Sequence, residues 1–539
     1  MPTNPANPRA IDTGARLAWR PLQRSTRLAI IGALLATMFY QLFLMNPAYR
    51  GPTWLWLSMV LAEGLTAFHA IGTWWTILAH DDRPEPLAVS VYREQLRSGG
   101  VEVPSIDVFI TAYGEAPELV RTTMRAARDM DLPHKTWVLD DGDDDELERI
   151  CAQEGVGYLR REGGQHAKAG NVNAALARTN GEFIVIFDAD HVPEPSFLIQ
   201  VLPHFQDYEV AFVQSPQSYT NHVNLVSTGS AEAQRIFYEL VCPGKNYFNA
   251  VFCVGTNVIF RRQALDEIGG LHTASNSEDI WTSLELHRRG WRSVFLREAL
   301  ARGLAPDNLL SYFKQQFRWS YGGFEVLIRG KLFRRRTGLT LDQRFQYLLV
   351  GTNYLLSLSV LVFMFLPSAY LLFGLSPVRA DLHTWLTHYV PFYVLIVLVT
   401  WLQCGGFKPA AIVTSIGAAP VHARALLMVL LRRKASWTVT NARAGGLPGV
   451  ELVLPQIALL LLNAVAIVVG LSAVTDPPAV ALAVGWAVLH MLFLGRVIAE
   501  ALLGPRREAG RIEERKAGAR IARARPWRAP ATEATEIAM

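Results

Sequence analysis

Long apolar runs lie at both ends of the chain and leave a more polar stretch between them. A membrane-spanning helix needs about 20 consecutive apolar residues, and each of these runs approaches or exceeds that length. The first run is too long for a signal-peptide core and leads quickly into the second, which favours a retained helix. The pattern predicts a multi-pass α-helical membrane protein with spans at Leu28–Met45, Trp54–Ala79, Tyr347–Leu372, Trp385–Leu402, Val450–Val474 and Ala479–Leu503.

Strands and helices alternate in the polar middle of the chain. Short apolar runs bounded by turn residues predict strands, and Glu118–Arg128 has the pattern of a helix packed against them. Such alternation is typical of a mostly parallel sheet covered by helices on both faces. Ligands of these sheets bind beyond the carboxyl ends of the strands. The predicted strands are Ile106–Ala112, Thr136–Leu139, Gly157–Leu159, Phe183–Phe187 and Val210–Val213.

Basic residues set the orientation of the predicted spans. The chain is 50% hydrophobic, only 18% charged, and has a formal net charge of +5. Its Lys and Arg residues gather beside the apolar runs and form no single stripe, which argues against a nucleic-acid partner. Cytoplasmic loops carry the excess of Lys and Arg, so the polar middle is expected on the cytoplasmic side of the plasma (inner) membrane. The flanking clusters are Arg16, Arg20, Arg24 and Arg27; Arg424, Arg432, Arg433 and Lys434; and Arg506, Arg507 and Arg511.

These patterns divide the chain into seven segments. A weakly amphipathic stretch, Ala410–Lys434, is expected to lie as a helix on the inner membrane surface. The segments are a cytoplasmic N-terminus (1–26), two transmembrane helices (27–79), a cytoplasmic α/β domain with interface helices (80–341), two transmembrane helices (342–404), a cytoplasmic interface helix and loop (405–449), two transmembrane helices (450–503) and a basic cytoplasmic tail (504–539).

Acidic residues follow two of the predicted strands directly. Asp140-Asp141-Gly142 comes after one strand and Asp188-Ala189-Asp190-His191 after another. Hard divalent cations such as Mg²⁺ or Mn²⁺ take one or two carboxylates and complete their shell with phosphate oxygens and water. A D-x-D sequence alone also occurs in ordinary surface turns. Its position at a strand end of an α/β sheet favours a site for a metal and a diphosphate.

Two further motifs lie nearer the third apolar run. Ser277-Glu278-Asp279 precedes a predicted helix, Ile280–Arg289, and supplies either a general base or an ordinary helix cap. Gln315-Gln316-Phe317-Arg318-Trp319 lies where the cytoplasmic domain approaches the membrane. Its Trp offers a flat face for a sugar ring and its Arg can hold a diphosphate, although an interfacial Trp is also common in membrane proteins.

The order of these motifs, with membrane helices on both sides, resembles the processive family 2 glycosyltransferases, and specifically the catalytic subunit of bacterial cellulose synthase. Local matches extend the resemblance over roughly residues 27 to 503. They are Ala112-Tyr113-Gly114-Glu115, His166-Ala167-Lys168-Ala169-Gly170-Asn171, Phe252-Cys253-Val254-Gly255-Thr256-Asn257, and Trp437-Thr438-Val439-Thr440, which is similar to the F-x-V-T gating loop of that family.

The resemblance implies a GT-A-like glycosyltransferase domain and a role for each matching residue. Asp279 is the expected catalytic base. Asp188 and Asp190 are expected to hold Mg²⁺ or Mn²⁺ together with the diphosphate. The remaining expected site residues are Tyr113, Asp140, Lys168 and Asp188 for the nucleotide; Glu278, Gln315, Arg318 and Trp319 for the diphosphate and acceptor sugar; and Trp437, Val439 and Thr440 in the gating loop.

The implied reaction is inverting, processive transfer of glucose from UDP-glucose to a growing β-glucan, which leaves the cell through the protein's own helices. The implied partners are a UDP-sugar, the polysaccharide, the lipid bilayer and accessory secretion subunits. Cellulose, 1,3-β-glucan and mixed-linkage glucan stay open as products, as do another β-linked polysaccharide and a non-processive transfer to a lipid acceptor. An ATP-driven transporter is disfavoured, because the chain has no G-x-x-x-x-G-K-[ST] motif.

Two departures from the family pattern bear on product and regulation. Trp437 replaces the first Phe of the gating loop, and Ala442 stands where a Lys is expected. Arg507 and Arg511 have the R-x-x-x-R spacing of a cyclic-di-GMP site, but the small-residue motif and β-barrel expected to follow are absent from this sequence. Binding of cyclic-di-GMP is therefore left open.

Overall fold

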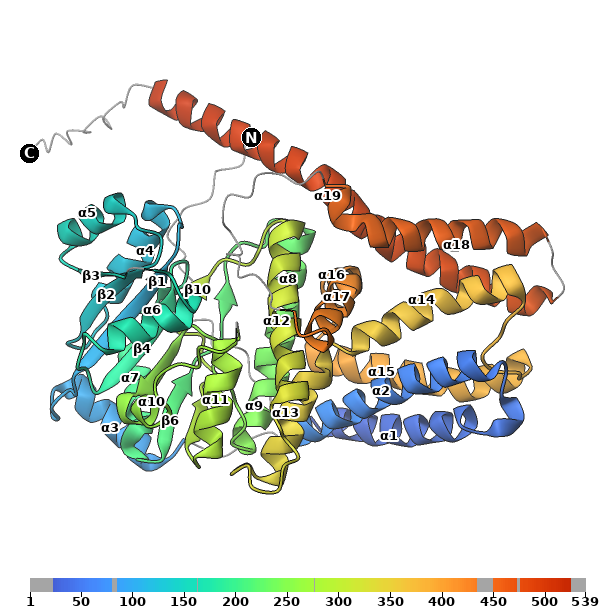
Figure 1. Ribbon diagram of the computed structural model, residues 1–539, viewed down its shortest axis with the longest axis horizontal. Coiled ribbons are helices and arrows are strands. Elements are labelled where there is room, and N and C mark those ends of the chain that lie inside the picture. The colour runs from blue at the N-terminus through green and yellow to red at the C-terminus, as the bar shows by residue number, and fades with distance from the viewer. Residues whose placement is uncertain are drawn as a thin grey trace, which may run out of the picture.

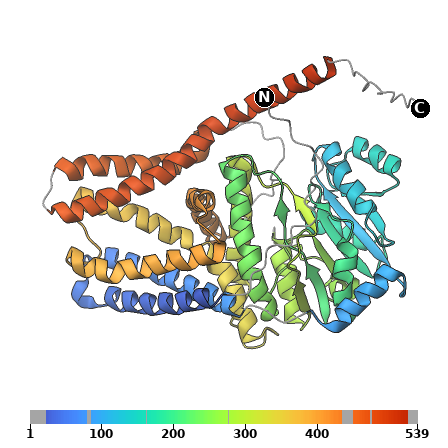
Figure 2. The ribbon, with the colours of Figure 1, turned by 180° about the vertical axis from the view of Figure 1, so that it is seen from behind.

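The structure is a computed structural model that describes residues 23–79, 85–161, 163–275, 277–433, 449–472 and 476–524. An α/β domain lies at one end of the molecule, and long apolar helices extend away from it at the other (Figure 1). Several shorter helices run across the junction between the two parts, as the view from behind also shows (Figure 2). The architecture confirms a multi-pass helical protein with an inserted α/β domain.

A seven-stranded sheet with the order β3-β2-β1-β4-β8-β6-β9 forms the centre of the α/β domain. Four neighbouring pairs are parallel, and β8 runs antiparallel to both of its neighbours. A small second sheet, β5-β10-β7, lies beside it. The strands are β1 (Ile106–Ala112), β2 (Lys135–Asp140), β3 (Gly157–Arg160), β4 (Phe183–Asp188), β5 (Val192–Pro193), β6 (Val210–Gln214), β7 (Ser218–Tyr219), β8 (Val258–Arg261), β9 (Arg292–Phe295) and β10 (Ala301–Gly303).

All five predicted strands are present, within one residue at each end, and the sheet is mostly parallel as expected. The sequence analysis missed β8 and β9. Each has only four residues, and neither Val-Ile-Phe-Arg of β8 nor Arg-Ser-Val-Phe of β9 alternates apolar and polar residues in sequence. Without β8, the prediction lacked the two antiparallel pairings.

Helices cover both faces of the sheet. On β1, Val108 and Ile110 point to one face and pack with α4, whereas Phe109 points to the other and packs with α6. This alternation follows from the period of two along a strand. The covering helices are α3 (Leu87–Ser98), α4 (Pro117–Arg128), α5 (Asp145–Glu154) and α7 (Phe197–Val201) on the first face, and α6 (Ala167–Leu176), α10 (Arg262–Ile268) and α11 (Glu278–Arg288) on the second.

Six helices in the described ranges are long and apolar enough to cross a membrane. A seventh would be counted if α16 and α17, which meet at a 42° bend, formed one broken span. The six are α1 (Arg24–Leu44), α2 (Thr53–Leu78), α14 (Leu356–Phe373), α15 (Leu382–Cys404), α18 (Leu454–Ser472) and the apolar part of α19 (Pro477–Ala524).

The third predicted span, Tyr347–Leu372, was wrong at its start. The chain instead forms α13 (Leu341–Asn353) and begins α14 only at Leu356. The Tyr347 hydroxyl lies 2.8 Å from Nδ1 of His287 in the α/β domain, and Gln346 donates to Thr76 at the end of α2. These polar contacts hold α13 at the junction, so the candidate membrane span is formed by α14, which follows it.

The junction helices lie between the sheet and the membrane helices (Figure 1). The surface helix predicted within Ala410–Lys434 is the bent pair α16–α17, of which α16 packs on α8 and α17 on α12. Hydrophobic clusters join these helices to one another and to α11 of the α/β domain. The junction helices are α8 (Leu225–Ile236), α9 (Cys242–Tyr247), α12 (Leu309–Arg329), α13, α16 (Pro409–Gly417) and α17 (Ala419–Leu430).

Candidate active site

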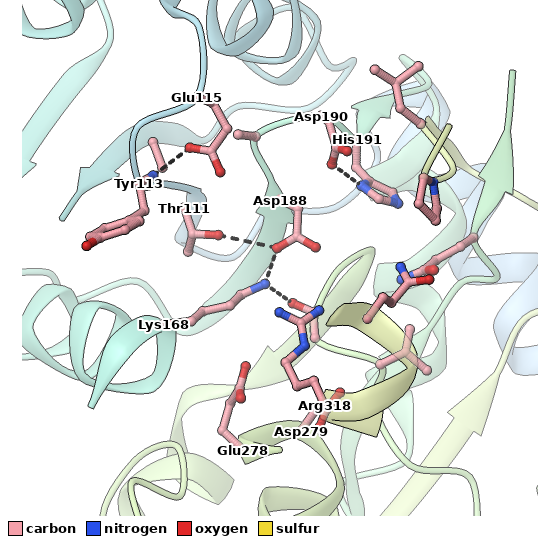
Figure 3. A pocket seen from close by; sticks show the side chains of 18 of the residues that line it. Thr111, Tyr113, Glu115, Lys168, Asp188, Asp190, His191, Glu278, Asp279 and Arg318 are labelled. Carbon is pink, nitrogen blue, oxygen red and sulfur yellow. Dashed lines mark hydrogen bonds and ion pairs between the residues drawn. The ribbon is translucent and has the colours of Figure 1, made fainter. Parts of the chain in front are cut away.

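A pocket opens at the carboxyl ends of the central strands and is closed on its far side by α11 and α12 (Figure 3). The strand ends form one wall of this pocket, and the parallel register brings them together. Thr111 of β1 lies opposite Asp188 of β4, and Ala112 of β1 lies opposite Asp140 of β2. The acidic groups that follow separate strands in the sequence therefore meet at one edge of the sheet, as expected for an α/β fold.

Asp140 is buried and its carboxylate organises the loop after β2. Its two oxygens accept hydrogen bonds from the backbone of Gly142 (2.6 Å) and Asp144 (2.8 Å) and from the hydroxyl of Tyr158 (2.7 Å). The neighbouring Asp141 lines the pocket instead. The expected contact between Asp140 and a nucleotide stays a prediction, and the structure shows how Asp140 shapes the loop at the pocket rim.

Lys168 and Asp188 form an ion pair in the middle of the pocket (Figure 3). Nζ of Lys168 also donates to the carbonyl oxygen of Gly255, at 2.7 Å. Burial alone would raise the pKa of Asp188, but Lys168, His191 and Arg318 together outweigh it and hold that pKa below its usual value. Burial opposes the charge on Lys168, but Asp188 and Glu278 raise its pKa above the usual value. The pocket therefore holds a fixed cation beside a fixed carboxylate.

Asp188, Asp190 and His191 place one ligand atom each within 4.8 Å of one another. His191 Nδ1 lies 2.8 Å from Asp190 Oδ1, and its other nitrogen, Nε2, is buried without a hydrogen-bond partner among the described residues. Two carboxylates with an adjoining imidazole fit a divalent cation. The sequence analysis quoted His191 in its motif but did not assign it to the site.

Tyr113 lies at the pocket rim, half-exposed, directly after β1. Its backbone N–H donates to a carboxylate oxygen of Glu115 at 2.5 Å. Burial raises the pKa of Glu115, and the charges of Asp188 and Asp190 raise it further. Glu115 thus adds a carboxyl group to the pocket lining that the sequence analysis did not select.

Glu278 and Asp279 begin α11 and face the ion pair from the opposite wall (Figure 3). Oδ1 of Asp279 accepts a hydrogen bond from the backbone N–H of Ile280 at 2.8 Å. Burial raises the pKa of Asp279, and burial with the neighbouring charge raises the pKa of Glu278 to about 7. A carboxylate with a raised pKa, aimed into a cavity, can accept a proton from a bound hydroxyl.

Gln315, Arg318 and Trp319 line the same pocket from α12. The positive charge of Arg318 favours the ionised forms of Asp188, Glu278 and Asp279. Three motifs that lie between Asp188 and Trp319 in the sequence are therefore gathered in one cavity.

The gating-loop residues Trp437, Val439 and Thr440 lie outside the described residues, so their assignment stays a prediction.

Comparison with protein families agrees with this geometry. The profile "Glycosyltransferase like family 2" matches residues 104–322, which include every pocket-lining residue named above. The α/β domain is therefore similar to glycosyltransferase family 2 over most of its length. A second profile, "Cellulose synthase", matches residues 266–405, which run from α10 through the pocket-lining residues of α11 and α12 to α14 and α15.

Curated proteins similar to the chain include cellulose synthase catalytic subunits. The chain is 34% identical to that of Pseudomonas fluorescens over 362 residues, which are 65% of this chain and 48% of the relative. It is 39% identical to that of Xanthomonas axonopodis pv. citri over 255 residues, 46% of this chain and 35% of the relative. The chain thus spans less than half the length of these relatives.

Among solved structures, the chain is similar to a mannosyltransferase from Pyrobaculum calidifontis in complex with GDP-Man and Mn²⁺. That similarity has a TM-score of 0.46 and 16% sequence identity, and covers 70% of this chain and 100% of that one.

Proposed function

We propose that the protein transfers glucose from UDP-glucose, with inversion, to the end of a growing β-glucan and passes the polymer into its own membrane helices. The observation that carries the proposal is the gathering of Lys168, Asp188, Asp279 and Trp319 in one cavity. Lys168 supplies positive charge for the donor diphosphate, and Asp188 would help to hold the divalent cation that accompanies it. Asp279 and Trp319 lie on the side formed by α11 and α12. A soluble transferase has no need of an acceptor side built into a membrane junction.

The donor side binds the nucleotide and its diphosphate. Lys168 and Arg318 supply positive charge for phosphate oxygens, and Tyr113 lies where a uracil ring would enter. Asp188, Asp190 and His191 fit Mg²⁺ or Mn²⁺, which when bound would offset the charge that grows on the leaving diphosphate. Asp140 keeps the loop below the nucleotide in place through its three hydrogen bonds.

Asp279 is the proposed catalytic base. It removes the proton from the acceptor hydroxyl while that oxygen bonds to the anomeric carbon and the bond from this carbon to UDP breaks. Attack from the face opposite UDP inverts the configuration and gives a β-linkage from an α-linked donor. The backbone N–H of Ile280 holds one Asp279 oxygen and leaves the other, Oδ2, on the pocket side near Gly255 and Lys168.

Trp319 is the proposed platform for the terminal sugar of the acceptor. An indole face binds a sugar ring through apolar contact and lets it slide. On the same helix, Oε1 of Gln316 lies 3.2 Å from Nε2 of His422 on α17, and Nδ1 of His422 lies 2.6 Å from the hydroxyl of Ser357 on α14. Polar contacts therefore link α12, which carries Trp319, to the start of a membrane helix, and a gating loop containing Trp437, Val439 and Thr440 would close the cavity.

The cellulose synthases among the relatives favour cellulose as the product, with 1,3-β-glucan and mixed-linkage glucan as alternatives. The catalytic domain faces the cytoplasm, and the helices cross the plasma (inner) membrane, because the flanking basic clusters lie on that side. Accessory secretion subunits would receive the polymer on the other side.

The decisive experiment uses the full chain, purified and reconstituted in nanodiscs, with UDP-glucose and Mg²⁺ or Mn²⁺. We expect an insoluble glucan whose linkage analysis shows one dominant β-linkage, and no product from the Asp279→Asn variant. UDP-N-acetylglucosamine serves as the matched donor control. A product with a single sugar on a lipid would contradict processive synthesis, and a polymer made only from the control donor would contradict the choice of glucose.

A further inference from the structure

A polar stripe runs along α12 beyond the residues that line the pocket. Gln315, Arg318, Gly322, Glu325 and Arg329 recur at intervals of three or four, so they share one face of the helix. The first two line the pocket, whereas Glu325 lies two turns further on and is buried. Burying a carboxyl group costs free energy unless its partners are well placed, so its contacts are informative.

Glu325 fastens the loop that carries the catalytic motif. One of its oxygens accepts a hydrogen bond from the hydroxyl of Ser275 at 2.6 Å, and the other accepts from Arg329 at 2.5 Å. The Ser275 hydroxyl in turn accepts a hydrogen bond from the backbone N–H of Ser277 at 3.1 Å. A chain of contacts therefore leads from α12 to the residue immediately before Glu278.

A second contact ties the same loop to the same helix, one turn nearer the pocket. A Cβ atom on Gly322 would lie only 1.8 Å from the hydroxyl oxygen of Ser277, so only glycine allows this approach. The Ser277 hydroxyl also lies 3.5 Å from the carbonyl oxygen of Arg318. Ser277 makes no side-chain cap on α11, so its neighbours on α12 and Ser275 fix its position instead.

We propose that Glu325 is a positioning residue that sets the distance between the Asp279 carboxylate and the acceptor sugar on Trp319. The positions of both groups depend on α12. Trp319 belongs to this helix, and Asp279 follows a loop that Glu325 and Gly322 hold against it. This inference rests on the proposed function for the identity of the acceptor. Proton transfer needs heavy atoms within hydrogen-bond reach, so a loosened loop lowers the rate without emptying the donor site.

The test compares Glu325→Ala, Glu325→Gln and Ser275→Ala in the reconstituted full chain. A small misplacement of reacting groups can cost up to about 100-fold, so we expect Glu325→Ala to lower kcat about 10- to 100-fold with KM for the donor within about twofold. Glu325→Gln should recover most of the rate, because its amide oxygen still accepts from Ser275. Glu285→Ala, which removes a comparable ion pair with Arg288 on α11, is the matched control and should keep the wild-type rate.

Two measurements separate positioning from loss of folding. The double variant Ser275→Ala/Glu325→Ala should be no slower than Glu325→Ala alone, because both changes break the same chain of contacts. UDP affinity should stay within about twofold of wild type in every variant. Additive losses, an equal fall in UDP affinity, or no rescue by Gln would overturn the proposal. Should Glu325→Ala fail to fold, Ser275→Ala must show the same selective loss of kcat for the proposal to stand.

The outcome is independent of which sugar is transferred. If wild-type protein makes no glucan but transfers another sugar, the proposed function fails, and the same variants test Glu325 on that transfer. If wild-type protein makes glucan and Glu325→Ala matches it in kcat, the positioning role alone fails.

Discussion

The two walls of the pocket are held in place by different kinds of contact. On the wall proposed to bind the donor, Asp140 and Asp188 end β2 and β4, the two strands that flank β1. Backbone N–H groups hold the Asp140 carboxylate, and the Asp188 carboxylate pairs with Lys168 while its backbone N–H donates to Thr256. On the acceptor wall, Asp279 and Trp319 come from two helices, and side-chain contacts such as Ser275–Glu325 hold these helices together. The donor wall belongs to the sheet, whereas the acceptor wall belongs to helices that continue toward the membrane.

This difference matches the two tasks of a polymerase. The nucleotide enters and leaves the same fixed site in every cycle, which suits a wall built on strand ends. The acceptor advances by one sugar per cycle, which suits a wall connected to α14 and α17 through Ser357 and His422. The comparison predicts that changes to each wall have separable kinetic effects.

The largest expected effect is on the acceptor wall. Asp279→Asn should slow transfer about 10²- to 10⁴-fold, the usual contribution of a general base, because an amide cannot accept the proton. UDP binding should change only a few-fold, since Lys168 and Asp188 are intact. Parallel rate and UDP-binding measurements on one preparation check this. Near-wild-type turnover in Asp279→Asn would show that Asp279 is not the catalytic base.

A large effect is also expected on the donor wall. Asp190→Ala should lose at least about 100-fold of the divalent-dependent activity, because changes even in the partners of metal ligands cost up to that much. Titration of activity with Mg²⁺ and Mn²⁺ measures the loss, and Asp141→Asn is the matched control, a pocket-lining carboxylate outside the proposed metal site. Full wild-type activity in excess chelator would show that Lys168 and Arg318 replace the metal.

Trp319→Ala sharpens the comparison, because it should separate polymer synthesis from donor use. Stacking on an aromatic face contributes about 1–3 kcal/mol in nucleic-acid systems, so we expect polymer yield to fall about tenfold or more. UDP binding should persist, and slow release of UDP by hydrolysis should continue because water needs no platform. Polymer yield and UDP release are measured together. Long polymer at the wild-type rate would leave Trp319 as an ordinary interfacial residue.

The smallest expected effect concerns pH. Burial raises the pKa of Asp279, so the base is protonated, and inactive, at a higher pH than an ordinary Asp. Activity should therefore fall as pH decreases, with an acid limb clearly above the usual Asp pKa of about 3.9. Because Glu278 and Asp279 are neighbours and each affects the titration of the other, the apparent pKa of this acid limb describes the two carboxyl groups together. A pH profile of kcat checks it, and a limb near pH 4 would contradict a buried base.

The sequence placed Asp140, Asp188 and Asp190 at the carboxyl edge of the sheet because each lies at or just beyond the end of an apolar run, whereas Lys168 was selected only from the family resemblance. Asp188 and Asp190 were found from the strand that precedes them, and the parallel register then determined which groups meet. Which of Asp140 and Asp141 lines the pocket could not be predicted from the preceding strand. Adjacent residues point in different directions, and which one turns inward depends on the loop and on Tyr158.

The acceptor wall was only partly predictable. The motifs containing Asp279 and Trp319 were recognisable, but Glu325 was not, because its significance depends on Ser275, which lies fifty residues away and in another element. The start of α14 was misplaced for a similar reason. Tyr347 is apolar enough for a membrane run, and contacts such as those of Tyr347 with His287 and Gln346 with Thr76 keep this segment at the junction.

The account's central claim is that one chain both polymerises the glucan and carries it across the membrane. The most direct test uses proteoliposomes in which the catalytic domain faces outward, with UDP-glucose supplied outside and a β-glucan hydrolase added after synthesis. The account predicts that the polymer resists the hydrolase until detergent opens the vesicles, because it has been threaded into the lumen. Polymer that is digested immediately, with the vesicles intact, would contradict transport through the protein's own helices.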